Sequence, residues 1–304
     1  MIIQIIGDLD PRRLDLLRGG VEPGDVVRSD SDKHAANPPE VVFVWAQRRD
    51  VLVDLLDRSG PALRWVHFRR VGIPDSTLKL FDAFPRVQVT TGSGASGVAV
   101  AEHALALLLA LLKRLPELSE RQRQHTWERE FPASDLHGQT ACIVGVGDVG
   151  VHVARLLRAF GVRTLGVRRR AAGVAEVDET YAVDGLSGAL ERSTVLVLAA
   201  TLTPETRHLI GAAELGRLPA GALVINVGRG AVLDEPALVA ALQRGHVAGA
   251  GLDVLEEEPL PGDSPLWDLP NVIVTPHSAA HTQGTDDRSV GLFLSRLERF
   301  RRGD

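Results

Sequence analysis

The sequence predicts an α/β protein built on parallel sheets, and three observations lead to this fold class. Short apolar runs alternate with helix-length amphipathic stretches, a pattern typical of sheets that are covered by helices on both faces. The length of 304 residues suits two domains of ~100–200 residues each. A glycine-rich turn, Gly145–Gly150, directly follows an apolar run near the middle of the chain.

The N-terminal part contains four apolar runs that we interpret as strands: Ile2–Ile6, Val41–Trp45, Leu63–Phe68 and Val87–Thr90. A helix is expected near Asp50–Arg58. The small residues Gly92–Gly97 then lead into Val98–Arg114, which is rich in Ala and Leu and is closed by Pro116. This pattern predicts a helix, and we place a domain boundary at its start.

A second alternating region begins at Gln139 and contains six predicted strands: Thr140–Val144, Arg163–Val167, Thr194–Ala199, Ala222–Asn226, Gly249–Val254 and Val272–Thr275. Six strands with helices between them suit a doubly wound, Rossmann-like sheet. Residues 117–139 are polar, with Trp127 and Phe131 as anchors, and are expected to form an arm or loop. The stretch Gly284–Phe300 predicts a last helix.

Composition and charge exclude several function classes. A net charge of −5 argues against general nucleic-acid binding, which usually needs a basic face. The most apolar stretch, Val98–Leu112, is shorter than the ~20 residues that a membrane span requires. No signal peptide is apparent, and the single cysteine, Cys142, excludes a disulfide framework. We expect a cytoplasmic protein with no membrane or nucleic-acid partner and no metal site.

The glycine-rich turn lies between a predicted strand and a helix expected over Val151–Phe160, which is the context of a dinucleotide-binding turn. Gly145 permits the tight turn, Gly147 lets the backbone approach a pyrophosphate, and Gly150 lets the helix pack close to the strand. The N–H groups at the helix start favour the phosphates. We predict dinucleotide binding here, with an ordinary strand-to-helix turn as the alternative.

Two residues within this turn, Asp148 and Val149, are also assigned to the cofactor site. The Asp148 carboxylate disfavours a pyrophosphate unless it points away or pairs with an arginine. Cofactor choice is predicted from the end of the next strand, where an acid usually bonds the ribose 2′-hydroxyl of NAD. Here Arg168-Arg169-Arg170 follow instead. Since guanidinium groups pair with phosphate, we predict that NADP(H) is preferred over NAD(H), with a solvated basic loop as the alternative.

Polar residues follow three later predicted strands, where the sites of open α/β sheets gather. Arg229 lies between two glycines, the acidic run Glu256–Glu258 follows the next strand, and His277 follows the last one. Each has a plain alternative: a surface turn, a solvated acidic face and a structural histidine, respectively. Together they offer a carboxylate clamp and an acid–base pair.

On these motifs the chain resembles the D-isomer-specific 2-hydroxyacid dehydrogenase family, which includes glyoxylate/hydroxypyruvate reductases and 3-phosphoglycerate dehydrogenases. The matching stretches occur in the family's order over about residues 60–280. They are Ala99–His103, Gly145–Gly150, Leu202–Arg207, Asn226–Gly230, Leu233–Glu235, Leu252–Pro259 and Thr275–His277. The resemblance implies that residues 97–282 form a cofactor domain inserted into a flavodoxin-like substrate domain of residues 1–96 and 283–304.

The resemblance also implies the roles of the site residues. Arg229 holds the substrate carboxylate and carbonyl. His277 is the general acid during reduction, and Glu258 bonds to it and keeps imidazolium available near neutral pH. Asp253 lies near the nicotinamide end of the cofactor. Further cofactor contacts are assigned to Arg168, Arg169, Thr201, Thr206, Val227 and Gly228.

The loop Phe68–Pro74 departs from the family pattern, because it is bulkier and more basic than usual. Family members take substrate contacts from this loop, and we assign Arg69 and Gly72 to the substrate together with Arg229 and His277. Arg69 or Arg70 could recognise a second anionic group or be a surface charge. Trp45 could wall the pocket or simply pack.

The expected activity is D-specific, NAD(P)-dependent hydride transfer with a small 2-oxo or 2-hydroxy acid such as glyoxylate or hydroxypyruvate. A 3-phosphoglycerate dehydrogenase-like enzyme is one alternative, although the chain ends soon after its last helix and leaves no room for a regulatory domain. A non-enzymatic, dinucleotide-sensing protein like the family's corepressors is another. A formate dehydrogenase is disfavoured, because that subgroup pairs its histidine with glutamine. The family resemblance suggests a homodimer.

Overall fold

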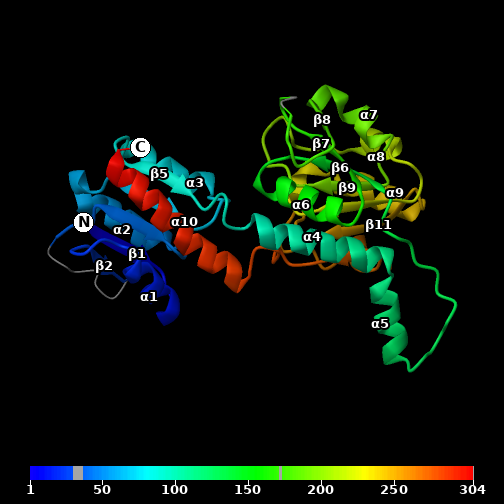
Figure 1. The fold of residues 1–304 in the computed structure, drawn as a ribbon, viewed down its shortest axis with the longest axis horizontal. Coiled ribbons are helices and arrows are strands. Elements are labelled where there is room, and N and C mark those ends of the chain that lie inside the picture. Colours follow the sequence, from blue (N-terminus) through cyan, green and yellow to red (C-terminus); the bar gives the residue numbers. More distant parts are fainter. Residues whose placement is uncertain (30–36, 171–172, 304) are drawn as a thin grey trace. The chain divides into compact units, whose positions relative to one another are not determined.

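The computed structural model describes residues 1–29, 37–170 and 173–303. The chain divides into two compact units, Met1–Ser96 with Gln283–Asp304, and Gly97–Thr282. Each unit is built around one parallel sheet, so the predicted α/β fold class is confirmed. Figure 1 shows that the chain crosses between the units twice, once before α4 and once before α10.

The first unit has a five-stranded sheet in the order β2-β1-β3-β4-β5. Its strands are β1 (Ile2–Ile6), β2 (Val26–Arg28), β3 (Val41–Val44), β4 (Trp65–Phe68) and β5 (Gln88–Thr91). The sequence did not predict β2, because this edge strand has only three residues and none of them is fully buried. An edge strand with so little burial lacks the apolar run that marks the central strands.

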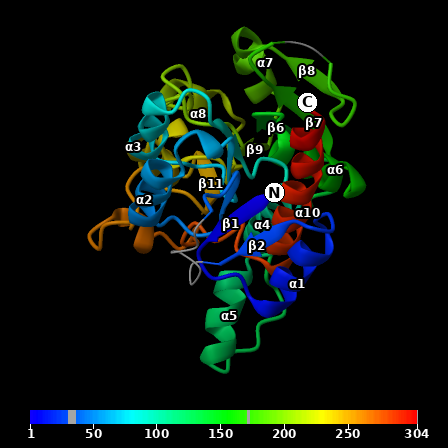
Figure 2. The same ribbon diagram turned by 90° about the vertical axis from the view of Figure 1, so that its left-hand side faces the viewer.

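In the part of this unit that the structure describes, the α-helices are α1 (Pro11–Gly19), α2 (Arg49–Ser59), α3 (Asp75–Leu78) and α10 (Gln283–Arg302). Side chains of α1 and α10 pack on one face of the sheet, and those of α2 pack on the other. Phe293 of α10 stacks on Phe43 and Trp65, with ring centroids 4.4 and 5.2 Å apart. Figure 2 shows α10 running beside α1, so the C-terminal helix completes the N-terminal unit.

A histidine of this sheet, on the strand next to the edge strand β5, is fully buried. His67 of β4 is fully buried, and its Nδ1 lies 2.8 Å from the Thr90 hydroxyl, which accepts from the Trp65 indole at 2.8 Å. Its Nε2 has no hydrogen-bond partner among the described residues. Burial lowers the pKa of His67 to about 3, and the nearby Arg296 adds to the shift. The folded state therefore holds this imidazole neutral.

His67 should make the protein less stable as the pH falls. Below the ordinary pKa of about 6.5 the unfolded chain binds a proton at this ring, whereas the folded chain does so only near pH 3. Stability is therefore present above pH 6.5 and is lost progressively as the pH falls toward 3, at most about 1.4 kcal/mol per pH unit. Urea unfolding of the parent and of His67→Phe, followed by circular dichroism between pH 7 and 4, should show a flatter pH dependence for the variant. Equal slopes would contradict this assignment.

The second unit has a seven-stranded sheet in the order β12-β11-β10-β9-β6-β7-β8. Its strands are β6 (Thr140–Val144), β7 (Arg163–Val167), β8 (Glu179–Tyr181), β9 (Val195–Leu198), β10 (Ala222–Asn226), β11 (Val247–Leu252) and β12 (Val272–Val274). The direction of chain progression reverses between β6 and β9, which is the switch point of a doubly wound sheet. The six predicted strands are present, and β8 is a seventh that the sequence did not reveal, because it is short and only half-buried.

Helices cover both faces of this sheet. The residues of α4 (Gly97–Leu112) and α6 (Asp148–Ala159) share one apolar core, and Figure 1 shows these two helices side by side. The opposite core contains residues of α7 (Leu186–Leu190), α8 (Ala212–Arg217) and α9 (Glu235–Gln243). Because both faces are covered, the central strands consist of continuous apolar residues.

The expectation of an arm or loop over 117–139 is wrong at its start, where α5 (Leu115–Arg123) forms. Arg114 adopts a left-handed conformation with φ +50° between α4 and α5. Pro116 then lies in the first turn of α5, where its missing N–H costs no helical hydrogen bond. This proline therefore begins a helix instead of closing one. No side chain of α5 is buried, which is why no apolar periodicity marked it.

Candidate active site

The sheet order of the second unit places the candidate residues along one edge. Parallel strands present their carboxyl ends on the same side, and neighbouring strands are ~4.8 Å apart. Across the sheet from β12 to β7, the groups that follow the strand ends are His277, Asp253, Arg229, Thr201, the glycine turn and Arg168. The catalytic candidates Arg229, Glu258 and His277 thus follow three adjacent strands, and the cofactor candidates follow the next three, apart from Asp253, Val227 and Gly228, which lie beside the catalytic candidates.

The three glycines of the turn differ in what surrounds them. Gly145 has φ +96°, and a Cβ there would lie 2.5 Å from the backbone nitrogen of Ala200. A Cβ on Gly150 would lie 2.1 Å from the Gly145 carbonyl oxygen, so the helix packs directly against the turn. Gly147 is exposed, and a Cβ there would meet nothing within 4 Å. The turn is therefore tight at both ends and open in the middle.

The open middle of this turn is the start of α6. Gly147 is the N-cap residue, and no side chain caps the helix, which leaves the first N–H groups available to an anion. Asp148 points away from this position: its carboxylate lies against Gly97 at the start of α4 and 3.8 Å from the His152 ring. Val149 is half-buried. These residues fit the pyrophosphate of a dinucleotide.

Arg168 and Arg169 follow β7 directly. The backbone N–H of Arg168 donates to the Tyr181 carbonyl at 3.1 Å, which continues the pairing with β8. Neither guanidinium forms an ion pair within the described part of the chain. Arg169 lies near Glu205, whose pKa is lowered by the Thr203 hydroxyl, by its own backbone N–H and by this arginine. The Arg169 guanidinium thus lies near the loop that follows β9.

That loop forms a self-contained turn. The Thr206 hydroxyl donates to the Thr201 carbonyl at 2.7 Å and accepts from the Thr203 N–H at 2.7 Å. Gly228 packs against its beginning, since a Cβ at Gly228 would lie 2.7 Å from the Ala200 carbonyl oxygen. Val227 is buried, so the structure shows a packing role for its side chain and leaves only its backbone for a cofactor contact.

Arg229 is held by the glycines on either side of it. Because Gly228 has no side chain, its backbone can lie close to the loop that follows β9. Gly230 lies so close to Leu255 that a Cβ on it would be 1.8 Å from the Leu255 carbonyl oxygen. The buried Asn226 bridges the loop, accepting from the Gly228 N–H and donating to the Arg229 carbonyl, each at 3.2 Å. The Arg229 guanidinium donates to the Gly228 carbonyl at 2.7 Å and has no ion-pair partner in the described ranges.

The structure brings His277 and Glu258 together. The Nδ1 atom of His277 lies 2.8 Å from Oε2 of Glu258, and Oε1 of Glu258 accepts from the Leu255 N–H at 3.1 Å. His277 has φ +52°, a left-handed conformation that is uncommon for a residue with a side chain. Both side chains are more than a third exposed. Nε2 of His277 has no partner among the described residues and is free to exchange a proton.

Glu235 at the start of α9 supports the loop that carries Glu258, a role that the sequence did not reveal. Its carboxylate accepts from the backbone N–H of Glu256. Burial raises the pKa of the Glu235 carboxyl, and the acidic neighbours Glu256, Glu257 and Glu258 add to the increase. Its position in the stretch Leu233–Glu235, which matches the family, was the one available signal.

Asp253 is buried, and its carboxylate is bound by protein groups. Oδ1 accepts from the Thr275 hydroxyl at 2.7 Å and from the Ser278 N–H at 2.9 Å, and Oδ2 accepts from the Ala279 N–H at 3.1 Å. The sequence assigned Asp253 to the cofactor. The structure shows in addition that it fixes the segment on either side of His277.

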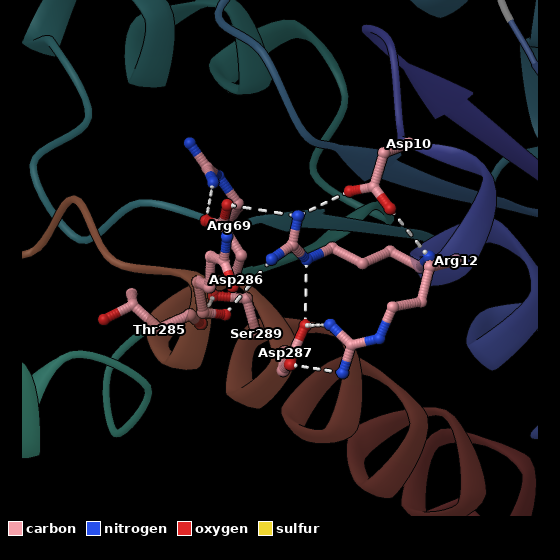
Figure 3. Close-up of polar contacts among 9 residues, drawn as sticks. Asp10, Arg12, Arg69, Thr285, Asp286, Asp287 and Ser289 are labelled. Atoms are coloured by element: carbon pink, nitrogen blue, oxygen red, sulfur yellow. Dashed lines mark hydrogen bonds and ion pairs between the residues drawn. The ribbon is translucent and has the colours of Figure 1, made fainter.

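Arg69 of the loop Phe68–Pro74 belongs to the first unit and lies in a network of charges (Figure 3). Its guanidinium pairs with Asp286 of α10 and lies 4.2 Å from the centroid of the Trp45 ring. Arg13 joins the same network through Asp286 and Asp287. Burial lowers the pKa of Arg69, an effect that Asp286 opposes. In this structure the charge of Arg69 is therefore already compensated within the unit.

After Arg69, the loop Phe68–Pro74 is more exposed. Gly72 is exposed, and its carbonyl accepts from the Gln47 amide at 3.4 Å. Arg70 is exposed and forms no ion pair in the described part of the chain. Trp45 packs edge-on against Phe43, with ring centroids 5.8 Å apart, and also contacts Arg69. Arg70 is therefore the uncompensated cation of this loop.

The described residues offer no metal site, no reactive cysteine and no membrane-spanning helix. No group of three or more His, Cys, Asp or Glu side chains there could hold a metal ion. Cys142 is buried in β6, and burial raises the pKa of its thiol to about 12, so it cannot serve as a thiolate nucleophile near neutral pH. Among the helices that are described, none combines the length and the apolar character needed to cross a membrane.

The chain is similar to known proteins over most of its length. The NAD binding domain model of the D-isomer specific 2-hydroxyacid dehydrogenases matches residues 105–279. A glyoxylate reductase of Korarchaeum cryptofilum is 36% identical over 288 residues, covering 88% of this chain and 85% of that protein. A glyoxylate/hydroxypyruvate reductase B of Pectobacterium carotovorum is 41% identical over 191 residues, covering 61% and 60%.

A solved structure supports the same comparison. A D-isomer specific 2-hydroxyacid dehydrogenase from Xanthobacter autotrophicus, solved in complex with NADPH and MES, has a TM-score of 0.81 and 31% sequence identity to this chain. The alignment covers 99% of this chain and 95% of that one. Both units of the present chain therefore have counterparts in a solved structure.

Proposed function

We propose a defined reaction for this chain, which belongs to the D-isomer specific 2-hydroxyacid dehydrogenase family. The chain is accordingly an NAD(P)-dependent oxidoreductase that acts on a small-molecule acid. We infer that it reduces a small 2-oxo acid of the glyoxylate or hydroxypyruvate class with NADPH, and that it gives the D-isomer where the product is chiral. Residues 97–282 would hold the cofactor, and residues 1–96 with 283–304 would supply the substrate loop.

The observation that carries this proposal is the order of groups along the sheet edge. His277, Asp253 and Arg229 follow three neighbouring strands, and the open glycine turn and Arg168 follow strands on the other side. A dinucleotide lying along this edge would place its phosphates at the start of α6. Its 2′ end would then be near Arg168 and its reactive end near the acid–base pair. This arrangement matches the general location of ligands in doubly wound sheets.

The chemistry follows from the groups present. Bound NADPH supplies the hydride that reaches C2 of the substrate. Negative charge grows on the carbonyl oxygen as this happens, and Nε2 of His277 is the free ring nitrogen that can donate a proton to it. Glu258 orients the ring through its contact with Nδ1, which leaves Nε2 facing away from the carboxylate. Arg229 can hold the carboxylate through two parallel hydrogen bonds.

We expect the preference for NADPH to depend on Arg168 and Arg169. Changing both to alanine removes the guanidinium groups proposed to pair with the 2′-phosphate, so the Kd for NADPH should rise by about 10–100-fold while that for NADH stays nearly unchanged. Nucleotide fluorescence titrations would measure both constants, with Arg163→Ala, a surface arginine that pairs with Glu179, as the control. Equal losses for the two cofactors would refute the 2′-phosphate assignment.

We also propose that the chain forms a homodimer through its cofactor domains, with α5 and the segment after it contributing. Figure 1 shows α5 extending away from the sheet of its own unit. Leu115 is 51% exposed, Leu118 is 36% exposed and Trp127 is 89% exposed. Exposed apolar side chains on an arm of this kind are typical of a surface that is covered by a second subunit.

The function is tested by NADPH oxidation with a panel of 2-oxo acids, followed by absorbance. The panel should contain glyoxylate, hydroxypyruvate, its phosphorylated form, pyruvate and 2-oxoglutarate. We expect turnover with the small monoanionic acids. A preference for an acid with a second anionic group would instead indicate a second anion site at the loop Phe68–Pro74, which carries Arg70. Absence of turnover with every acid, despite demonstrated NADPH binding, would contradict the proposed reaction.

A further inference from the structure

The contacts around Asp253 extend to a residue of α4 that has no assigned role. Nε2 of His103 lies 2.9 Å from the Thr275 hydroxyl and 3.5 Å from Oδ1 of Asp253. His103 is on the helix that begins the second unit, 172 residues before Thr275 in the chain. A helix side chain thus reaches the strand end that precedes His277.

The direction of these hydrogen bonds is determined by their geometry. The Thr275 hydroxyl has a single proton, which it donates to Oδ1 of Asp253 at 2.7 Å. Because its one proton is used in this way, the Thr275 hydroxyl oxygen can only accept a hydrogen bond from His103. Nε2 of His103 therefore carries a proton. The result is a directed relay from His103 through Thr275 to Asp253.

The far end of this relay is the backbone that carries His277. Asp253 accepts from the N–H groups of Ser278 and Ala279, which directly follow His277. The His277 N–H donates to the Asp253 carbonyl at 2.8 Å. Because His277 has φ +52°, its backbone needs such contacts to stay in this conformation. The side chain itself has only the bond to Glu258 to fix it among the described residues.

We propose that His103 is a positioning residue for His277 and acts through Thr275 and Asp253. His103 is not proposed to contact the substrate or the cofactor. It donates to the Thr275 hydroxyl, which in turn donates to the buried Asp253 carboxylate. That carboxylate fixes the two peptide units that follow the proposed proton donor. This role rests on the proposed function, since it concerns the geometry of the proton donor in the same reaction.

A misplaced proton donor reduces the rate without loosening the cofactor. We therefore expect His103→Leu to lower kcat by on the order of 10–100-fold while the Kd for NADPH and the KM change little. His103→Gln should restore most of the rate, because the glutamine amide can donate to the Thr275 hydroxyl. His246→Leu is the matched control: Nε2 of His246 lies 3.1 Å from the Leu215 carbonyl oxygen, away from this edge of the sheet.

A second pair of variants covers the case in which His103→Leu does not fold. Thr275→Val removes the relaying hydroxyl, whereas Thr275→Ser keeps it, and only the valine variant should lose kcat. A kcat of His103→Leu within about twofold of the parent, or an equal loss in His103→Gln, would overturn the proposal. So would equal activities of the two Thr275 variants.

Spectroscopy separates this proposal from the proposed function. The imidazole resonances of His277, identified by their loss in His277→Ala, should shift in His103→Leu and return toward the parent position in His103→Gln. This readout requires no substrate. A parent enzyme without turnover would contradict the proposed reaction, whereas unchanged His277 resonances in His103→Leu would contradict the positioning role.

Discussion

Replacing His277 with alanine should reduce kcat for 2-oxo acid reduction by about 10²–10⁴-fold, which is the usual contribution of a general acid. The variant loses Nε2 of His277, the ring nitrogen that has no partner among the described residues, while the glycine turn and the arginines after β7 stay intact. The Kd for NADPH should therefore be nearly unchanged. Steady-state rates and fluorescence titration of NADPH measure the two quantities.

His246→Ala is the control for this experiment, because it removes a histidine of the same unit that bonds to the Leu215 carbonyl. We expect its kcat to equal that of the parent. An active His277→Ala enzyme would refute the assigned acid. A parallel loss of NADPH binding would instead show that the substitution disturbs the cofactor domain.

Replacing Arg229 with glutamine should have the second large effect. Two charge-assisted hydrogen bonds to a carboxylate contribute about 3–6 kcal/mol, so kcat/KM should fall by about 10²–10⁴-fold. Arg229→Lys should recover little of this loss, because an ammonium group cannot form two parallel bonds. The close packing of Gly228 and Gly230 and the Asn226 bridge remain when the bond from the guanidinium to the Gly228 carbonyl is lost, so the variant should keep its fold.

Arg217→Gln is the matched control, since Arg217 is an exposed arginine that pairs with Glu191. Thermal unfolding of both variants checks that the fold is kept. A kcat/KM within tenfold of the parent for Arg229→Gln would mean that another group holds the substrate carboxylate.

The sequence predicts the elements of this fold where burial on both faces makes an apolar run. Residues such as Ile143 and Val197 lie in central strands with covered faces, and their runs were recognisable. The sequence did not predict the strand β8 or the helix α5. Their side chains are half-buried or exposed, so their sequence pattern resembles that of a loop. Pro116 added to the error, because a proline that begins one helix also looks like the end of another.

In the candidate site, too, the sequence indicates some of the residues and not others. The groups proposed to act directly, such as Arg229 and His277, follow strand ends and lie in short motifs, so the sequence indicates them. Groups that position them do not: His103 meets Thr275 across 172 residues of chain, and only the packing of α4 reveals the contact. The pairing of Arg69 with Asp286 is likewise a contact between distant segments.

The most direct test of the central claim follows the hydride itself. NADPH carrying deuterium at both C4 positions should be incubated with the parent enzyme and the best 2-oxo acid of the panel that gives a chiral product, such as hydroxypyruvate. The product is then analysed by mass spectrometry and chiral chromatography. We predict one deuterium at C2 of a D-2-hydroxy acid, and a strongly reduced yield with His277→Ala. NADPH oxidation without deuterium at C2, or no 2-hydroxy acid at all, would contradict direct hydride transfer to the substrate.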